Sequence, residues 1–336
     1  MARLRPAILA ATLSLAVWLS GAARAADVAF TAHVLPDFAI GHPERTQFGK
    51  LEWIGGFEIE ADNRDAGGFS GLVVSDHGQH LLSIADNALM LAASIRRDAE
   101  GRPVGLADTR TRRLTAAGGS GRLPDPDTES IDILDGPGAP RAVISLEGRP
   151  RLYVGPLGSD GLVGLVSPLP LPPATATLRR SKGLESVAAV PASTGLPGTM
   201  LILAERAENN AATDNQPGWL IGGPRPVAFR IHSTNGYDLT DAKFGPDGRL
   251  YVLERLFSLS AGVWARLRRF DVAGLADGAL LDGETLFEAS LAHQIDNMEG
   301  LALWTDAAGA TRVSMISDNN RLILQRTLYL EFRLKD

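Results

Sequence analysis

The sequence contains no cysteine among its 336 residues. Disulfide bridges, thiol nucleophiles and zinc–thiolate sites are therefore excluded. Aromatic residues make up only 6% of the chain, whereas glycine and proline number 36 and 20. A chain so rich in turn-forming residues favours many short strands over long helices, and we expect an all-β fold.

An excess of positive charge is also missing. The formal net charge is -6, and the first 25 residues hold three arginines and no acids, so the remainder carries -9. An acidic chain repels the phosphate backbone, so we expect no nucleic-acid partner. The sequence predicts a monomer that binds a small molecule.

Long hydrophobic runs are absent apart from one near the N-terminus. The run from Ala7 to Leu19 follows Arg3 and Arg5, and Ala23-Arg24-Ala25 matches a processing site. This pattern predicts a signal peptide over residues 1–25, cleaved near Ala25, and a periplasmic or secreted protein. The run is too short for a membrane span. Residues 26–336 are predicted to form one domain.

What the sequence does contain is a repeat. Five segments share the pattern apolar strand, turn, apolar strand and polar end: residues 69–87, 128–148, 184–206, 239–255 and 298–320. A polar residue stands near the start of each segment, at Ser70, Glu129, Glu185, Asp241 and Glu299, with intervals of 59, 56, 56 and 58 residues. Repeated hairpins of this length predict the blades of a β-propeller.

The number of blades depends on how the chain ends are counted. Residues 27–68 and the C-terminal stretch RLILQRTLYLEFRL contain further strand-like runs. Together they would form a sixth blade, and strands from both termini would then close the ring and remove exposed edges. We therefore expect a six-bladed propeller, with a five-bladed ring as the alternative.

The repeated polar residues predict a site at one mouth of the central channel. We expect metal ligands at Glu129, Asp86, Asp241, Glu205, Glu254 and Asp318. Catalytic roles are assigned to Glu185, Glu299, Arg206 and Arg255, and substrate contacts to Lys182, Asn319 and Asn320. Clustered carboxylates must be protonated, paired with cations or bound to a metal, and an all-oxygen set suits calcium. The structural alternative is that these acids form hydrogen bonds and ion pairs between blades.

Residues 207–229 interrupt the repeat. The sequence predicts a long loop here, with Trp219 and Arg225 either capping the channel mouth or, for Trp219, packed on a blade. His293 precedes Glu299 by six residues and is a further acid–base candidate.

Several motifs together resemble a known family. GGFSGL, KGLES, LTDAKFGPDGRLYVLER and NMEGLAL followed by ISDNN occur in order and are similar to the phytase-like domain family, described as esterase-like activity of phytase. The similarity runs from about Gly55 to Leu334. The resemblance implies a six-bladed propeller exported by bacteria, ester hydrolysis that includes phosphate esters, and calcium as a candidate cofactor. It transfers no catalytic residue.

The leading hypothesis is thus a hydrolase of phosphate or carboxylic esters with an acidic, calcium-binding channel mouth. A non-catalytic propeller that binds a ligand or an envelope partner is one alternative. A metal-dependent lactonase is the other, because such enzymes also use a ring of acids and asparagines. No serine-hydrolase elbow, phosphate-binding loop or zinc motif is present.

Overall fold

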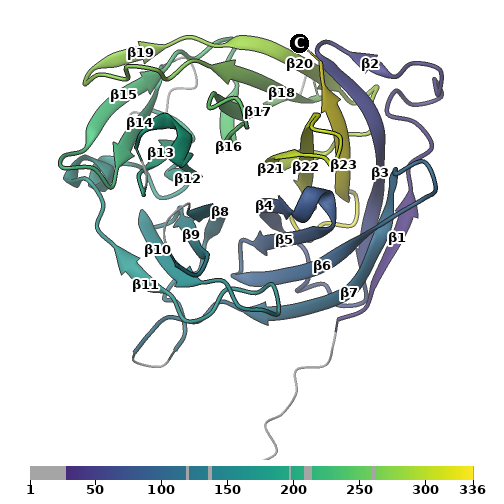
Figure 1. The fold of residues 1–336 in the computed structure, drawn as a ribbon, viewed down its shortest axis with the longest axis horizontal. Coiled ribbons are helices and arrows are strands. Elements are labelled where there is room, and N and C mark those ends of the chain that lie inside the picture. The colour runs from purple at the N-terminus through teal and green to yellow at the C-terminus, as the bar shows by residue number, and fades with distance from the viewer. Residues whose placement is uncertain are drawn as a thin grey trace, which may run out of the picture.

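The fold is a five-bladed β-propeller, seen in a computed structural model that describes residues 28–118, 121–134, 138–196, 198–207, 214–258 and 262–335. Five sheets, antiparallel except for one added strand in blade 3, are arranged around a central axis (Figure 1). Within the described residues the only helices are three short 3-10 turns: Asp76–Gly78, Pro173–Thr177 and Ala192–Thr194. The predicted all-β fold is confirmed. The predicted signal peptide, residues 1–25, lies outside the described residues.

The first four blades follow the chain. Blade 1 contains β4 (Phe69–Ser75), β5 (His80–Ala85), β6 (Leu89–Arg97) and β7 (Pro103–Arg113). Blade 2 contains β8 (Thr128–Leu134), β9 (Arg141–Leu146), β10 (Arg151–Pro156) and β11 (Ser167–Leu169). Blade 3 contains β12 (Leu184–Ala189), β13 (Met200–Ala204), β14 (Gln216–Ile221) and β15 (Val227–Ile231), with β19 (Ala279–Leu281) added in parallel. Blade 4 contains β16 (Asp238–Phe244), β17 (Leu250–Ser258), β18 (Gly262–Phe270) and β20 (Glu284–Ser290).

Blade 5 combines both ends of the chain. It runs from β21 (Asn297–Thr305) through β22 (Thr311–Asp318) and β23 (Thr327–Leu334) to β3 (Leu51–Ala61) and β1 (Phe30–Val34), with β2 (Gln47–Phe48) beside β3. The preferred count of six blades is therefore wrong, and the five-bladed alternative is confirmed. The strands expected to form a sixth blade are the outer strands of the fifth, so one blade was counted as two.

The inner strands β4, β8, β12, β16 and β21 contact one another in a closed ring. The hairpins that follow β16 and β21 are tight, and they contain Gly248 and Gly309, whose positive φ angles of 75° and 83° favour glycine. The five hydrophobic clusters lie one between each pair of neighbouring blades. Burial of aliphatic side chains at these interfaces, at about 25 cal/mol per Å², holds the ring together.

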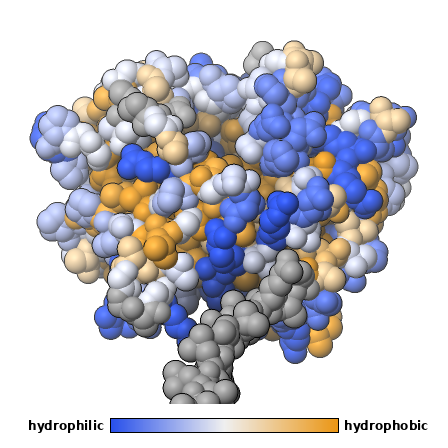
Figure 2. Space-filling model, turned by 60° about the horizontal axis from the view of Figure 1, so that its bottom comes forward, coloured by the Kyte–Doolittle hydropathy of each residue, from blue (hydrophilic) through white to orange (hydrophobic). Residues whose placement is uncertain are grey.

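Part of the outer surface is apolar as well. Figure 2 shows hydrophobic residues exposed between hydrophilic ones on one side of the molecule. Scattered apolar exposure of this kind is normal for a folded chain. Within the described residues no helix has both the length and the apolar character needed to cross a membrane.

Candidate functional site

A β-bulge near the start of every inner strand sets the orientation of the site. The pairing between the first and second strands slips by one residue in each blade, which leaves one unpaired residue on the inner strand. The unpaired residues are Ser70, Glu129, Glu185, Thr240 and Glu299. Bulges re-aim side chains next to active sites. All of these except Thr240 line one polar pocket of about 540 Å³.

Two further positions of each blade also face the pocket. On the second strand of each blade, one residue pairs with the residue just before the bulge. The residue that follows it faces the pocket, and in the five blades this is Asp86, Glu147, Glu205, Arg255 and Asp318. The residue two positions before the bulge contributes Asp127, Asp238 and Asn297, whereas blades 1 and 3 have glycine there. The site is therefore built from three positions of one structural repeat.

Blade 4 departs from the sequence prediction by one residue. Asp241 and Glu254 were expected at the channel mouth, but neither lines the pocket. Thr240 occupies the bulge and Arg255 the second position, so the repeat had been aligned one residue out. Because side chains alternate along a strand, a shift of one residue places the side chain on the other face.

Asp241 instead lies inside the ring of inner strands. It is fully buried and forms an ion pair with Lys243 at 2.9 Å. Its carboxylate also accepts hydrogen bonds from Ser130 at 2.7 Å, Ser186 at 3.2 Å and the backbone N–H of Leu301 at 2.9 Å. These partners come from blades 2, 3 and 5, so Asp241 joins blades together.

Glu254 is held within blade 4. Its two oxygens accept hydrogen bonds from Arg266 at 2.7 Å and Arg268 at 3.1 Å, and all three side chains are buried. The structural alternative considered from the sequence was an ion pair between blades, whereas the ion pairs of Glu254 lie within one blade.

The pocket carries a strong excess of negative charge. Nine carboxylates line it: Asp86, Asp127, Glu129, Glu147, Glu185, Glu205, Asp238, Glu299 and Asp318. The cations that line it are Lys182, Arg206 and Arg255. Three positive charges cannot neutralise nine acids, so other cations or bound protons must balance the rest.

The three cations lie together on the side of blades 3 and 4. Arg255 forms ion pairs with Glu299 and with Glu205, the latter at 3.4 Å. Lys182 pairs with Glu205 and lies 3.9 Å from Asp238. Arg206 donates to Asp238 at 2.6 Å. This arrangement leaves the acids of blade 2 outside the ion-pair network.

Asn297 supports this cationic side. Its side-chain amide donates a hydrogen bond to Glu299 at 2.7 Å, and Arg255 donates a hydrogen bond to the side-chain oxygen of Asn297. Glu299 is thereby held by two donors.

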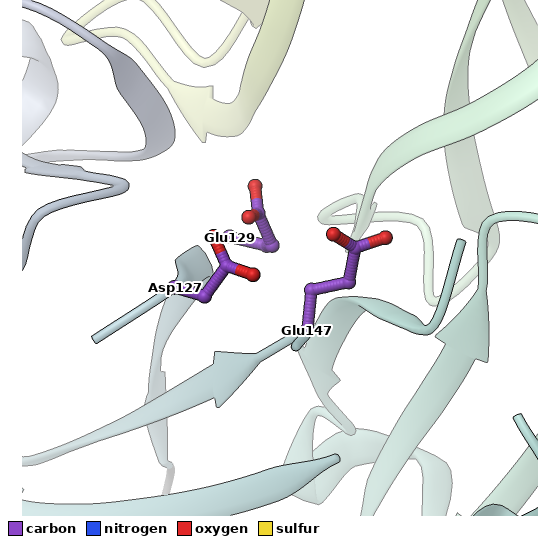
Figure 3. Close-up of side chains that lie close together, drawn as sticks. All are labelled: Asp127, Glu129 and Glu147. Atoms are coloured by element: carbon purple, nitrogen blue, oxygen red, sulfur yellow. The ribbon is translucent and has the colours of Figure 1, made fainter. Parts of the chain in front are cut away.

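The acids of blade 2 approach one another instead of a cation. Asp127, Glu129 and Glu147 offer oxygens that lie within 4.8 Å of one another (Figure 3). Burial raises the pKa of Glu147 to about 7, and nearby acids act in the same direction. Burial followed by the charge of Glu299 raises the pKa of Glu129 well above its usual range.

The same electrostatic conflict extends to blades 3 and 5. Burial, together with the charges of Glu205 and Glu129, raises the pKa of Glu185 well above its usual range. Burial and the charge of Glu299 raise the pKa of Asp318 to about 7. A bound cation would oppose these shifts, because it stabilises the ionised carboxylates.

The donor set fits a hard divalent cation. Three groups of acids overlap: Asp127 with Glu129 and Glu147, Glu129 with Glu185 and Glu299, and Glu147 with Glu185 and Glu205. Within each group the oxygens lie within 4.8 Å of one another. Two ligands that each stand about 2.4 Å from a calcium ion are at most about 4.8 Å apart, so the spacing allows shared coordination.

Asp127 and Glu147 were not predicted as ligands. Glu147 had a detectable signal, because it directly follows the second strand of its blade as Asp86 and Glu205 do, and Asp318 ends the corresponding strand of blade 5. The Asp127 side chain is positioned by a hydrogen bond from the N–H of Gly148 at 3.1 Å, and Glu147 by one from the N–H of Gly183 at 2.9 Å.

Two of the three residues predicted to contact substrate lie at the pocket. Lys182 and Asn320 line the pocket. Asn319 does not, because its side-chain oxygen accepts hydrogen bonds from the N–H groups of Gly68 at 3.1 Å and Arg321 at 3.0 Å. Asn319 therefore fixes the loop between blades 5 and 1.

The described residues of the segment from 207 to 229, and His293, do not contribute to the pocket. The stretch from 207 to 229 is not a strandless loop, because β14 and most of β15 lie in it, although residues 208–213 are outside the described part of the chain. Trp219 is buried in the cluster between blades 2 and 3, which is the packed alternative, and Arg225 is exposed and does not line the pocket. His293 stacks on Phe38 at 5.1 Å and also stays outside the pocket.

Comparison with known proteins supports the fold and assigns the family. The solved structures that match include an alpha-L-arabinofuranosidase from Podospora anserina in complex with cellotriose, with a TM-score of 0.50 and 8% identity over 84% of this chain and 97% of that one. At this identity the likeness concerns the fold alone. The search of curated proteins gave no match. The family model described as "Phytase-like: Esterase-like activity of phytase" matches residues 64–321, and the chain therefore belongs to this family.

Proposed function

We propose that this protein is a calcium-dependent ester hydrolase that acts on phosphate esters in the pocket at the channel mouth. The observation that carries the proposal is the set of three overlapping acid groups, contributed by blades 2, 3 and 5. Membership in the phytase-like family supports ester hydrolysis. Phosphate is favoured over carboxylic esters because the pocket also presents a lysine and two arginines, which suit an anionic group.

The acids and the cations have separate tasks in this proposal. Glu129, Glu147 and Glu185, which each belong to two of the acid groups, would hold calcium. When bound, calcium supplies positive charge that polarises a phosphoryl oxygen and offsets the repulsion between the acids and an anionic substrate. Arg255 and Lys182 would bind the remaining phosphoryl oxygens from the side of blades 3 and 4.

Glu299 stands between these two sides. It belongs to the acid group with Glu129 and Glu185 and also pairs with Arg255. Because Arg255 and Asn297 fix its carboxylate, Glu299 is placed to orient an attacking water molecule. The ordered donors reduce the reorganisation that the reaction would otherwise require.

Hydrolysis assays on the purified full chain test the proposal. We expect release of inorganic phosphate from alkyl and aryl phosphates in millimolar calcium, and its loss in excess chelator. Glu185→Gln and Glu299→Gln are expected to lose at least about 100-fold in kcat/KM while staying folded. Glu60→Gln, an exposed acid on β3, is the matched control and should leave turnover unchanged.

The alternatives predict different outcomes of the same assays. Calcium-dependent cleavage of acyl esters or lactones, without phosphate release, would replace phosphate esters as the substrate class. Absence of turnover on all three substrate classes, with calcium still bound, would favour a ligand-binding propeller. The periplasmic or secreted location predicted from the N-terminus is compatible with a cofactor that is abundant outside the cytoplasm, and it remains a proposal.

A further inference from the structure

One wall of the otherwise polar pocket is apolar. Among the residues that line it, those with hydrophobic side chains are Leu256, Phe257 and Val263. All three lie on the hairpin formed by β17 and β18 of blade 4. Phe257 and Val263 are directly paired across the two strands, so their side chains leave the sheet on the same face.

The apolar wall begins where the cationic side ends. Arg255 lies two residues before Phe257 on β17, so these two side chains leave the strand on the same face, whereas the Leu256 side chain between them leaves on the other. A phosphoryl group held by Arg255 would therefore direct its organic substituent either into the acids of blade 2 or along Phe257 and Val263. Desolvating carboxylates against an apolar group is costly, so the hairpin is the favourable direction.

This wall is open to solvent, so a ligand in the pocket can reach it. The Phe257 residue is 67% exposed although it lines a pocket. Apolar surface continues outward from the hairpin to Leu291, which is 56% exposed. The Leu291 side chain packs against Gly262 of β18, where an added Cβ atom would lie 3.2 Å from it. Ile40, which is 50% exposed, lies beside the same segment, because its backbone N–H donates a hydrogen bond to the carbonyl oxygen of Ala292 at 3.1 Å.

We propose that the substrate is an amphiphilic ester, with an anionic head on Arg255 and an alkyl or aryl group that covers Phe257 and Val263. The inference rests on the proposed function and narrows its substrate class. It distinguishes such esters from fully polar polyol phosphates, which would leave the wall exposed. Phe257 is thereby a specificity-determining residue and is not required for the hydrolytic step.

Two substrates with the same leaving-group chemistry test the proposal. Ethyl phosphate and hexyl phosphate both release a primary alcohol, and phosphate release in calcium measures both. We expect the wild-type protein to have a higher kcat/KM for hexyl phosphate than for ethyl phosphate. Phe257→Ser should lower the kcat/KM for hexyl phosphate about tenfold, mainly by raising KM. Ethyl phosphate should change less than about twofold. Leu165→Ser is the control, because Leu165 is 61% exposed on blade 2 away from the pocket.

Two results would overturn the inference while leaving the proposed function intact. One is equal kcat/KM for the two esters in the wild-type protein. The other is an equal loss for both esters in Phe257→Ser, which would indicate a general structural defect.

Binding of non-hydrolysable analogues keeps the inference testable if neither ester is cleaved. Calorimetry in calcium would compare methylphosphonate with hexylphosphonate. Tighter binding of hexylphosphonate that Phe257→Ser abolishes would support the apolar subsite, even though the hydrolase proposal would have failed. Equal affinity for the two phosphonates, or no binding of either, would overturn the subsite.

Discussion

Replacing Glu129 with glutamine should stabilise the protein when calcium is absent and weaken its response to calcium. Glu129 belongs to two of the acid groups and is buried. Two ionised carboxylates 4.8 Å apart repel each other by roughly 3 kcal/mol at an effective dielectric constant of ~20. Protonation already relieves part of this repulsion. We therefore expect Glu129→Gln to raise the free energy of unfolding by about 1–3 kcal/mol at pH 8 in chelator.

Calcium should reverse the order of the two proteins. The wild-type protein gains stability in proportion to the logarithm of calcium concentration over its dissociation constant. The variant lacks a ligand shared by two acid groups and should gain much less. Urea unfolding at pH 8, with chelator and with millimolar calcium, measures both effects, and Glu60→Gln is the matched control. A variant less stable than wild type in chelator, or one with an undiminished calcium response, would refute the reasoning.

Three further predictions concern the same region. In chelator, the free energy of unfolding should fall as the pH rises from about 5 to 8. The reason is that the folded-state pKa values of Glu147 and Asp318, about 7, exceed the ordinary values of 4.5 and 3.8, so the folded state binds protons that the unfolded state has already lost and releases them near pH 7. A urea midpoint that is flat or rises over this range would contradict this prediction. Arg255→Met should lower kcat/KM for phosphate esters at least about 100-fold, measured by phosphate release, and a loss below threefold would remove Arg255 from the site. Asp241→Asn should destabilise the fold by about 3–5 kcal/mol, because it leaves Lys243 buried without its carboxylate, while calorimetry should show unchanged calcium affinity; a matching loss of affinity would place Asp241 in the metal site.

The blade was predictable because its pattern is local. Aliphatic strands, glycine-containing turns and a polar residue at a regular interval all appear within single stretches of about 20 residues. The count of five blades was harder, since β3 and β23 pair across almost the whole chain. Local patterns do not show whether two such strands start a new sheet or extend an existing one.

The positions of individual site residues depended on register. Glu129, Glu185 and Glu299 line the pocket as expected, because the unpaired bulge residue is a glutamate in these three blades. In blade 4 an aspartate stands one residue after the bulge at Thr240, and the sequence pattern selected the acid. Only the hydrogen-bonded pairing of the strands shows which of the two residues is the unpaired one.

Asp127 and Asp238 illustrate a different limit. Both precede or begin an inner strand, where an acid is common in a turn and carries no specific signal. Their place in the pocket follows from the ring, which brings together residues from different blades. The catalytic, metal-binding and substrate-binding roles assigned to the pocket residues stay predictions.

The most direct test of the account is the location of calcium in crystals of the full chain, from the anomalous signal of crystals grown in calcium. The account predicts a peak in the pocket, about 2.3–2.6 Å from carboxylate oxygens of Glu129 and Glu185. A structure at saturating calcium in which these acids contact no ion, or in which calcium occupies only other surfaces, would contradict it.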